Sequence, residues 1–152
     1  KGIGICAGMH TCNVPGATGY IDTNFAGKLQ AAVQELQNGQ DFVYIHIEAP
    51  DECGHRGELA NKIYAIEQID QLILSGLIRA LQKMGDHSIL VLPDHPTPLA
   101  TKTHCADPVP YFLYRSTVQT GSGVSVFDEA SAKNTGIFIQ KGDTLMNRFL
   151  KR

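Results

Sequence analysis

The chain has 152 residues, of which 43% are hydrophobic and 18% charged, values typical of a globular domain and not of a disordered chain. The formal net charge of −2 offers no basic surface for nucleic acid and no polybasic anchor for a membrane. No apolar stretch approaches the ~20 residues that span a bilayer, and the first residues lack the pattern of a secretory signal. We therefore expect a cytoplasmic protein that binds neither nucleic acid nor membrane. Because the sequence enters a strand-like run directly at Lys1, we expect it to be part of a longer chain.

The cysteines are irregularly spaced and form no CxxC pair. Such spacing argues against a disulfide scaffold or a zinc finger and predicts reduced thiols. Two of them lie beside candidate metal ligands described below, so a thiolate site for a soft metal stays open as an alternative. The four residues are Cys6, Cys12, Cys53 and Cys105.

The first half of the sequence alternates short apolar runs with a longer amphipathic segment. Residues 2–7 predict a strand, and the loop over residues 14–19 follows it. Asn24 predicts the N-cap of a helix that runs to residue 37 and ends at Asn38-Gly39. Residues 41–47 form an almost continuous apolar run, as expected of a strand buried on both faces. This alternation predicts an α/β fold with a mainly parallel sheet flanked by helices.

The second half predicts a long helix followed by several short strands. The helix extends from about residue 58 to 84 and stops at Gly85. Its apolar residues recur at three, four or seven positions and predict one buried stripe, formed by Leu59, Ile63, Ile66, Ile73, Leu77 and Leu81. The predicted strands that follow cover residues 88–92, 110–114, 124–127 and 137–139, and a terminal helix covers residues 143–149.

Three clusters of acidic residues and histidines each lie at the end of a predicted strand. They are residues 48–55 after the second strand, Asp94-His95 after the third, and residues 104–108 just before the fourth. In an open α/β sheet the carboxyl ends of the strands form the edge that binds ligands. The order along the chain therefore predicts that these clusters contribute to one site.

The residue types in these clusters suit divalent metals. Asp51, His55 and His104 offer one carboxylate and two imidazoles, and Asp94 with His95 offers a second, partial set. Mixed oxygen and nitrogen ligation suits Mn²⁺ or Zn²⁺, and two such ions ~3.5–4 Å apart clamp a transferring phosphoryl group. Taken singly, each pair has an ordinary explanation, a turn before proline or a helix cap. Three clusters together favour a two-metal site.

Three further histidines have no cluster around them. We interpret His10 and His87 as surface or hydrogen-bonding residues. His46 falls within the second predicted strand, where we expect it to be a core residue whose polar atoms are hydrogen-bonded.

Several motifs point to a known family. They are the stretches VPGATGYIDTNFAGK, HIEAPDECGHRGE, KIYAIEQID, LPDHPTPLATKTHCADPVP and YFLYR. Their order, intervals and flanking residues resemble the C-terminal part of the archaeal type of 2,3-bisphosphoglycerate-independent phosphoglycerate mutases, in the alkaline phosphatase superfamily. The resemblance covers nearly the whole chain.

The resemblance implies that residues 1–152 are the C-terminal portion of an alkaline-phosphatase-like metal-binding domain. It implies that Asp51, His55 and His104 hold one metal, and that Asp94 and His95 help to hold the other. The ions would be Mn²⁺ or Zn²⁺, with Mg²⁺ as a further option, and no 2,3-bisphosphoglycerate would be needed.

The family's reaction passes a phosphoryl group between the two hydroxyls of phosphoglycerate through a serine, interconverting the 3- and 2-phosphates in glycolysis. In the family this serine lies in an N-terminal segment, and arginines that grip the substrate lie in a cap domain. We therefore expect no nucleophile within residues 1–152 and no activity from this chain alone. Two alternatives stay open: a phosphatase or phosphopentomutase-like enzyme of the same superfamily, and a non-catalytic metal-binding module.

Overall fold

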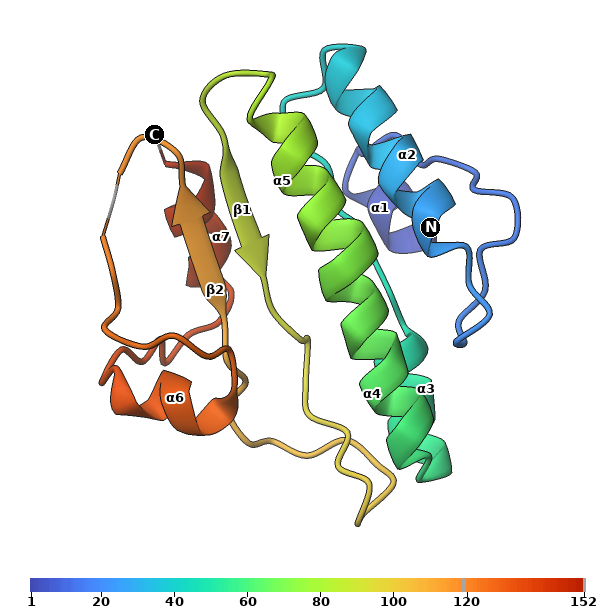
Figure 1. Ribbon diagram of the computed structural model, residues 1–152, viewed down its shortest axis with the longest axis vertical. Coiled ribbons are helices and arrows are strands. Elements are labelled where there is room, and N and C mark those ends of the chain that lie inside the picture. Colours follow the sequence, from blue (N-terminus) through green and yellow to red (C-terminus); the bar gives the residue numbers. More distant parts are fainter. Residues whose placement is uncertain (119, 152) are drawn as a thin grey trace. The chain divides into compact units, whose positions relative to one another are not determined.

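The computed structural model describes residues 1–118 and 120–151 (Figure 1). The chain divides into two compact units, Lys1–Ala80 and Leu81–Arg152. No helix in the part of the chain that the structure describes is long and apolar enough to cross a membrane. The elements in chain order are α1 (Gly2–Cys6), α2 (Phe25–Gln37), α3 (Ala49–Arg56), α4 (Leu59–Gln68), the π-helix η1 (Ile69–Leu74), α5 (Ser75–Leu81), β1 (Ser88–Val91), β2 (Phe112–Arg115), α6 (Glu129–Asn134) and α7 (Thr144–Leu150).

Helix α2 confirms the helix expected over this stretch, including both of its ends. The side-chain Oδ1 of Asn24 accepts a hydrogen bond of 2.8 Å from the backbone N–H of Gly27, which satisfies a donor that the first helical turn leaves open. Asn38 follows the last helical residue, and Gly39 has a φ of +94°. A positive φ costs glycine little, so the chain turns away from the helix there.

The long helix is also confirmed, although it ends at Leu81 and contains a π-helical segment. Figure 1 shows α4, η1 and α5 as one continuous green rod. The predicted stripe is correct from Ile73 onward but wrong before it, because Leu59, Ile63 and Ile66 are exposed. Ala65 is the buried residue of α4. The wider turns of a π-helix rotate the buried face of the helix away from its position in a regular α-helix. A prediction that assumes a regular α-helix cannot include this rotation.

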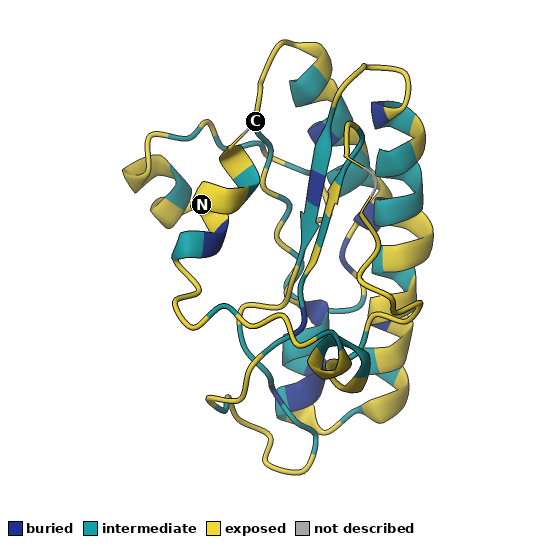
Figure 2. Cartoon of the chain, turned by 90° about the vertical axis from the view of Figure 1, so that its left-hand side faces the viewer, coloured by how far each residue is buried: buried dark blue, intermediate teal, exposed yellow. Residues whose placement is uncertain are grey.

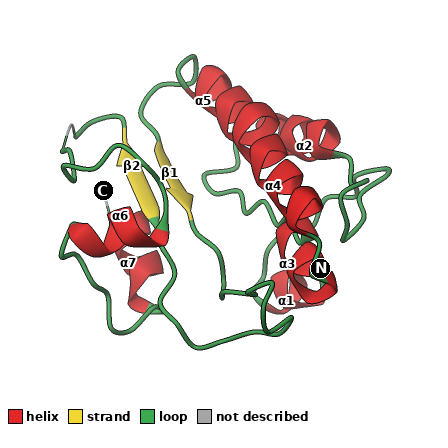
Figure 3. Ribbon diagram, turned by 60° about the horizontal axis from the view of Figure 1, so that its bottom comes forward, coloured by secondary structure: helices red, strands yellow, loops and turns green. Residues whose placement is uncertain are grey.

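The core of the first unit joins four elements. Phe25 of α2, Ala49 of α3, Ala65 of α4 and Ile73 of η1 form one buried cluster. Figures 1 and 3 both show α2 lying alongside the long helix. The first residue of α3 is therefore fixed in the core, which leaves the rest of that short helix on rigid support.

Two strands predicted in the first unit are not formed. Residues 2–7 contain helix α1, in which the backbone N–H of Ala7 donates to the carbonyl of Ile3. Residues 41–47 join no sheet among the described residues, and a strand is stable only when its backbone groups are paired. His46 is exposed there and is not the core residue that we expected. Figure 2 shows most of the chain in the colours of intermediate and exposed residues.

The second unit contains one sheet within the described residues. Strands β1 and β2 confirm two of the predicted strands and pair antiparallel, with Ser88 opposite Arg115 and Val91 opposite Phe112 (Figure 3). The expected mainly parallel sheet is therefore not confirmed. Parallel neighbours need a crossover connection, usually a helix, and the segment between β1 and β2 contains none.

The rest of the second unit differs from expectation in one further respect. The strands predicted at residues 124–127 and 137–139 are absent from the described chain, and helix α6 forms between them. Asp128 caps α6 by accepting a 2.6 Å hydrogen bond from the backbone N–H of Ser131. Helix α7 confirms the terminal helix, and Arg115 of β2 donates to the carbonyls of Arg148 and Phe149 at its end.

Candidate metal centre

The first pair of candidate ligands lies on a helix that the sequence did not predict. Pro50 suits the first turn of α3, because its missing N–H has no partner there in any helix. Asp51 is in the first turn and His55 in the last, where each complements the helix dipole in its charged form. Gly57, with a φ of +73°, ends the helix.

One helical turn places these two ligands on the same face of α3. Nε2 of His55 lies 3.4 Å from Oδ2 of Asp51, and both side chains are partly exposed. Two ligand atoms bound ~2.1 Å from one ion at a tetrahedral angle lie ~3.4 Å apart. The pair therefore fits the chemistry and the spacing of two ligands to one divalent ion.

A polar network holds the end of α3 against the loop at residues 14–20. The hydroxyl of Tyr20 donates to Glu58, and Nδ2 of Asn61 donates to both of them at 3.1 and 2.9 Å. The guanidinium of Arg56 lies 4.2 Å from the centre of the Tyr20 ring, a cation–π distance. These bonds, that of Tyr20 first, hold the pKa of Glu58 below its usual range.

Sequence reasoning missed this network. Arg56, Tyr20 and Glu58 lie outside the three clusters from which the site was predicted. The signal was present, because Tyr20 and Glu58 both fall within the stretches that carry the family resemblance. Their role is to position α3 and, with it, Asp51 and His55.

The second pair of candidate ligands follows β1. Nε2 of His95 lies 3.3 Å from Oδ2 of Asp94, and the backbone N–H of His95 also bonds that carboxylate at 3.0 Å. On its other side, Nδ1 of His95 lies 3.4 Å from the hydroxyl of Thr97, which is buried. Both ring nitrogens of His95 therefore have a polar neighbour, Asp94 on the Nε2 side and Thr97 on the Nδ1 side.

The third cluster is brought to the second by the loop that joins them. The rings of His95 and His104 lie 3.6 Å apart between centroids. The backbone N–H of Cys105 donates to the carbonyl of Pro96 at 3.2 Å, which ties the two ends of the loop together. The loop therefore brings an imidazole of the third cluster directly beside one of the second.

Among the described residues, the thiols nearest the candidate ligands, Cys53 and Cys105, belong to no group of three potential metal ligands. Cys53 is fully buried, and burial raises its pKa, so the thiol stays protonated and inert. The thiol of Cys105 donates to Oδ2 of Asp107 at 3.1 Å.

Asp51 and His55 belong to the first compact unit, and Asp94, His95 and His104 to the second.

A family model described as "Metalloenzyme superfamily" matches residues 3–151. The chain belongs to the metalloenzyme superfamily. Within it, the structure titled "Structure of PH0037 protein from Pyrococcus horikoshii" is similar, with a TM-score of 0.78 and 30% sequence identity. That similarity covers 88% of this chain and 39% of the other, and it supports the α/β class.

Named relatives in this superfamily confirm the resemblance noted in the sequence. The chain is 45% identical over 152 residues to a probable 2,3-bisphosphoglycerate-independent phosphoglycerate mutase from Geobacter sulfurreducens, which covers 100% of this chain and 38% of that protein. It is 46% identical over 152 residues to the mutase of that name from Methanosarcina acetivorans, covering 99% of this chain and 38% of the relative. The chain thus spans about 38% of the length of these relatives.

Proposed function

We propose that residues 1–152 are the metal-binding part of a cofactor-independent phosphoglycerate mutase, which interconverts 3- and 2-phosphoglycerate without 2,3-bisphosphoglycerate. The names of relatives more than 40% identical to the chain support this proposal. The observation that carries it is the Asp51–His55 pair, set one turn apart on a helix at a spacing that suits one ion.

In this proposal five residues of the chain hold two divalent ions. Asp51, His55 and His104 bind one, and Asp94 and His95 contribute to the other. Oxygen and nitrogen donors without sulfur suit Mn²⁺ or Zn²⁺, and Mg²⁺ is a further option. Two such ions act as Lewis acids that neutralise a phosphoryl group in transfer.

The remaining parts of the proposal concern the whole protein. The substrate is phosphoglycerate, the reaction belongs to glycolysis in the cytoplasm, and the serine that takes the phosphoryl group lies outside residues 1–152. The role of this chain is then to hold and orient the metals. The network of Tyr20, Glu58 and Asn61 keeps α3 in place for that purpose.

The test is an assay of the complete protein that contains this chain. Conversion of 3-phosphoglycerate is followed without 2,3-bisphosphoglycerate, before and after chelation, beside hydrolysis of a generic phosphate ester. We expect Asp51→Asn to lower kcat/KM for the mutase reaction by at least ~100-fold, because changes outside the ligand set alone cost 10–100-fold. His46→Ala, at an exposed position, is the matched control.

Each other outcome has a definite meaning. Ester hydrolysis without mutase activity would replace the proposal with a phosphatase. Metal binding with neither activity would replace it with a non-catalytic metal-binding module.

A further inference from the structure

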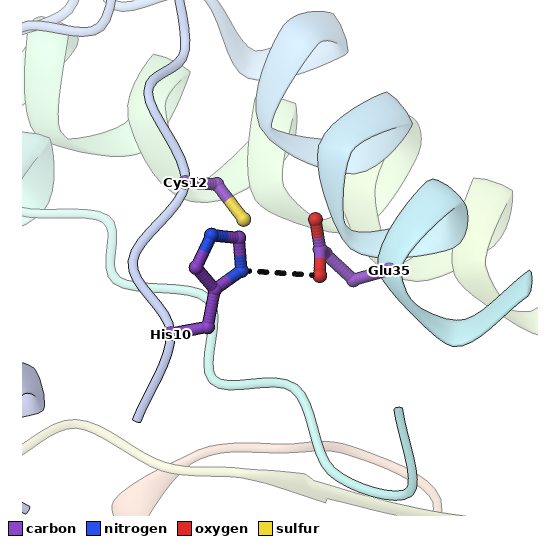
Figure 4. A group of neighbouring side chains, drawn as sticks. All are labelled: His10, Cys12 and Glu35. Atoms are coloured by element: carbon purple, nitrogen blue, oxygen red, sulfur yellow. Dashed lines mark hydrogen bonds and ion pairs between the residues drawn. The ribbon is translucent and has the colours of Figure 1, made fainter. Parts of the chain in front are cut away.

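A second group of metal-ligating side chains lies in the first unit, apart from the Asp51–His55 pair. His10 and Cys12 come from the segment between α1 and α2, and Glu35 comes from α2. Figure 4 shows the three side chains pointing toward one another. One ligand atom from each lies within 4.8 Å of the other two, and Nδ1 of His10 lies 3.3 Å from Oε2 of Glu35.

We propose that His10, Cys12 and Glu35 form a Zn²⁺ site with three protein ligands. Zinc is held in proteins by this combination of thiolate, imidazole and carboxylate, at ~2.0–2.3 Å from each. Ligand atoms in such a tetrahedron lie ~3.3–3.7 Å apart. The imidazole and the carboxylate already meet that spacing, and the side chain of His10, which is 66% exposed, is able to swing toward the sulfur.

The surroundings of Glu35 favour a cation there. Glu35 lies in the last turn of α2, which carries no basic residue. A carboxylate is disfavoured at this end of a helix, because the helix dipole is negative there. A bound divalent ion offsets that repulsion.

The surroundings of Cys12 argue against a nucleophile. Burial raises the pKa of the Cys12 thiol, and a hydrogen bond with Glu35 and the charge of that carboxylate raise it further. The charge of Lys1 lowers this pKa. Reactive cysteines need a lowered pKa. Zinc binds the thiolate, so a zinc ion that binds here displaces the thiol proton.

This site depends on neither the proposed mutase activity nor the ligands on α3. It is distinguished from them by its sulfur, which prefers softer metals than an oxygen and nitrogen set does. Because His10 is exposed and Cys12 and Glu35 are only partly buried, an ion reaches the site from solvent.

The test is a Co²⁺ titration of the 152-residue chain under a phosphine reductant, because Co²⁺ bound to a thiolate gives a near-ultraviolet charge-transfer band. We expect wild type to show this band and Zn²⁺ to abolish it by displacement. Cys12→Ser should remove the band, and His10→Ala and Glu35→Gln should each weaken the apparent Kd by at least ~10-fold. Cys6→Ser and Cys105→Ser are matched controls that should leave it unchanged.

Three results would overturn the proposal. The first is that wild type, shown by circular dichroism to be folded, gives no band. The second is that Cys12→Ser keeps the band, and the third is that either control loses it. His10→Ala changes an exposed side chain, so it keeps the test decisive even when Cys12→Ser disturbs the fold.

Discussion

Nε2 of His55 lies 3.4 Å from Oδ2 of Asp51, one turn away on the same face of α3. This relationship depends on the helix, because the same two residues in an extended loop would lie much farther apart. The helix in turn depends on its first residue, Ala49, which is buried in the core, and on the contacts that hold its last turn. Changes that destabilise the first unit are therefore expected to disturb the spacing of these two ligands as well as the fold.

The cap of α2 should contribute measurably to stability. Asn24→Ala removes the acceptor for the backbone N–H of Gly27 and the 2.9 Å bond from Nδ2 to the carbonyl of Pro15. We expect a loss of ~1–2 kcal/mol in the free energy of unfolding, the upper range for such caps, measured by urea denaturation. Asn24→Asp keeps the acceptor and should lose less, and equal losses would show that the cap bond is unimportant.

The same cap should make Gly27 intolerant of a larger residue. A Cβ at Gly27 would lie 2.4 Å from Nδ2 of Asn24 and 3.0 Å from Cγ1 of Val14. We expect Gly27→Ala to destabilise by ~1–3 kcal/mol, whereas Gly142→Ala meets no atom within 4 Å and should be nearly neutral. In the Asn24→Ala background the loss should shrink, because the clash with the Asn24 amide is gone and only the close contact with Val14 is left. A loss of the same size in both backgrounds would contradict this account.

The Tyr20–Glu58 bond should make stability depend on pH in the acid range. The folded-state pKa of Glu58 is lowered, first by the bond from Tyr20. Its contribution is therefore fully present above the unfolded value of ~4.3 and is lost as the pH falls through the folded value. We expect Glu58→Gln to have a lower Tm than wild type at neutral pH, with the difference shrinking below pH ~4. A difference that does not change with pH would mean that the charge of Glu58 is irrelevant.

The cysteines should differ sharply in reactivity. Cys53 is fully buried and its pKa is raised by burial, whereas Cys6 is exposed. Because the thiolate is the reacting form, an alkylating reagent should modify Cys6 first and Cys53 only as fast as the first unit opens. Peptide mass spectrometry over a series of denaturant concentrations measures both rates. Modification of Cys53 that is fast and independent of denaturant would contradict its burial.

Local signals in the sequence predicted some elements well. The amide of Asn24 and the glycine at 39 determine where α2 begins and ends. Both signals can be recognised in the sequence because they act on the backbone next to them. The long helix could be predicted from the spacing of its apolar residues. The π-helical segment at Ile69–Leu74 could not, since no residue there indicates a wider turn. Because of this segment, the buried face of the long helix was predicted wrongly as far back as Leu59.

Strands were predicted less well, because a strand depends on partners far away in the sequence. Residues 41–47 have the composition of a buried strand and yet join no sheet among the described residues. Helix α3 was missed because its charged residues were interpreted as a ligand-binding loop. Its stability comes from capping and from the burial of Ala49 and Cys53, and burial depends on residues far away in the sequence. The candidate ligands themselves were predicted from residue type and order, and that they share ions remains a proposal.

The most direct test of the central claim is Mn²⁺ binding to the 152-residue chain, measured by calorimetry. Mn²⁺ avoids thiolate ligands, so the site of Cys12 does not interfere. We predict a site that His55→Ala and His104→Ala each weaken by at least ~10-fold, with the double variant losing little more than either, because the two imidazoles hold one ion. Binding that His55→Ala leaves unchanged in a folded chain, or losses that simply add, would contradict a site shared by Asp51, His55 and His104.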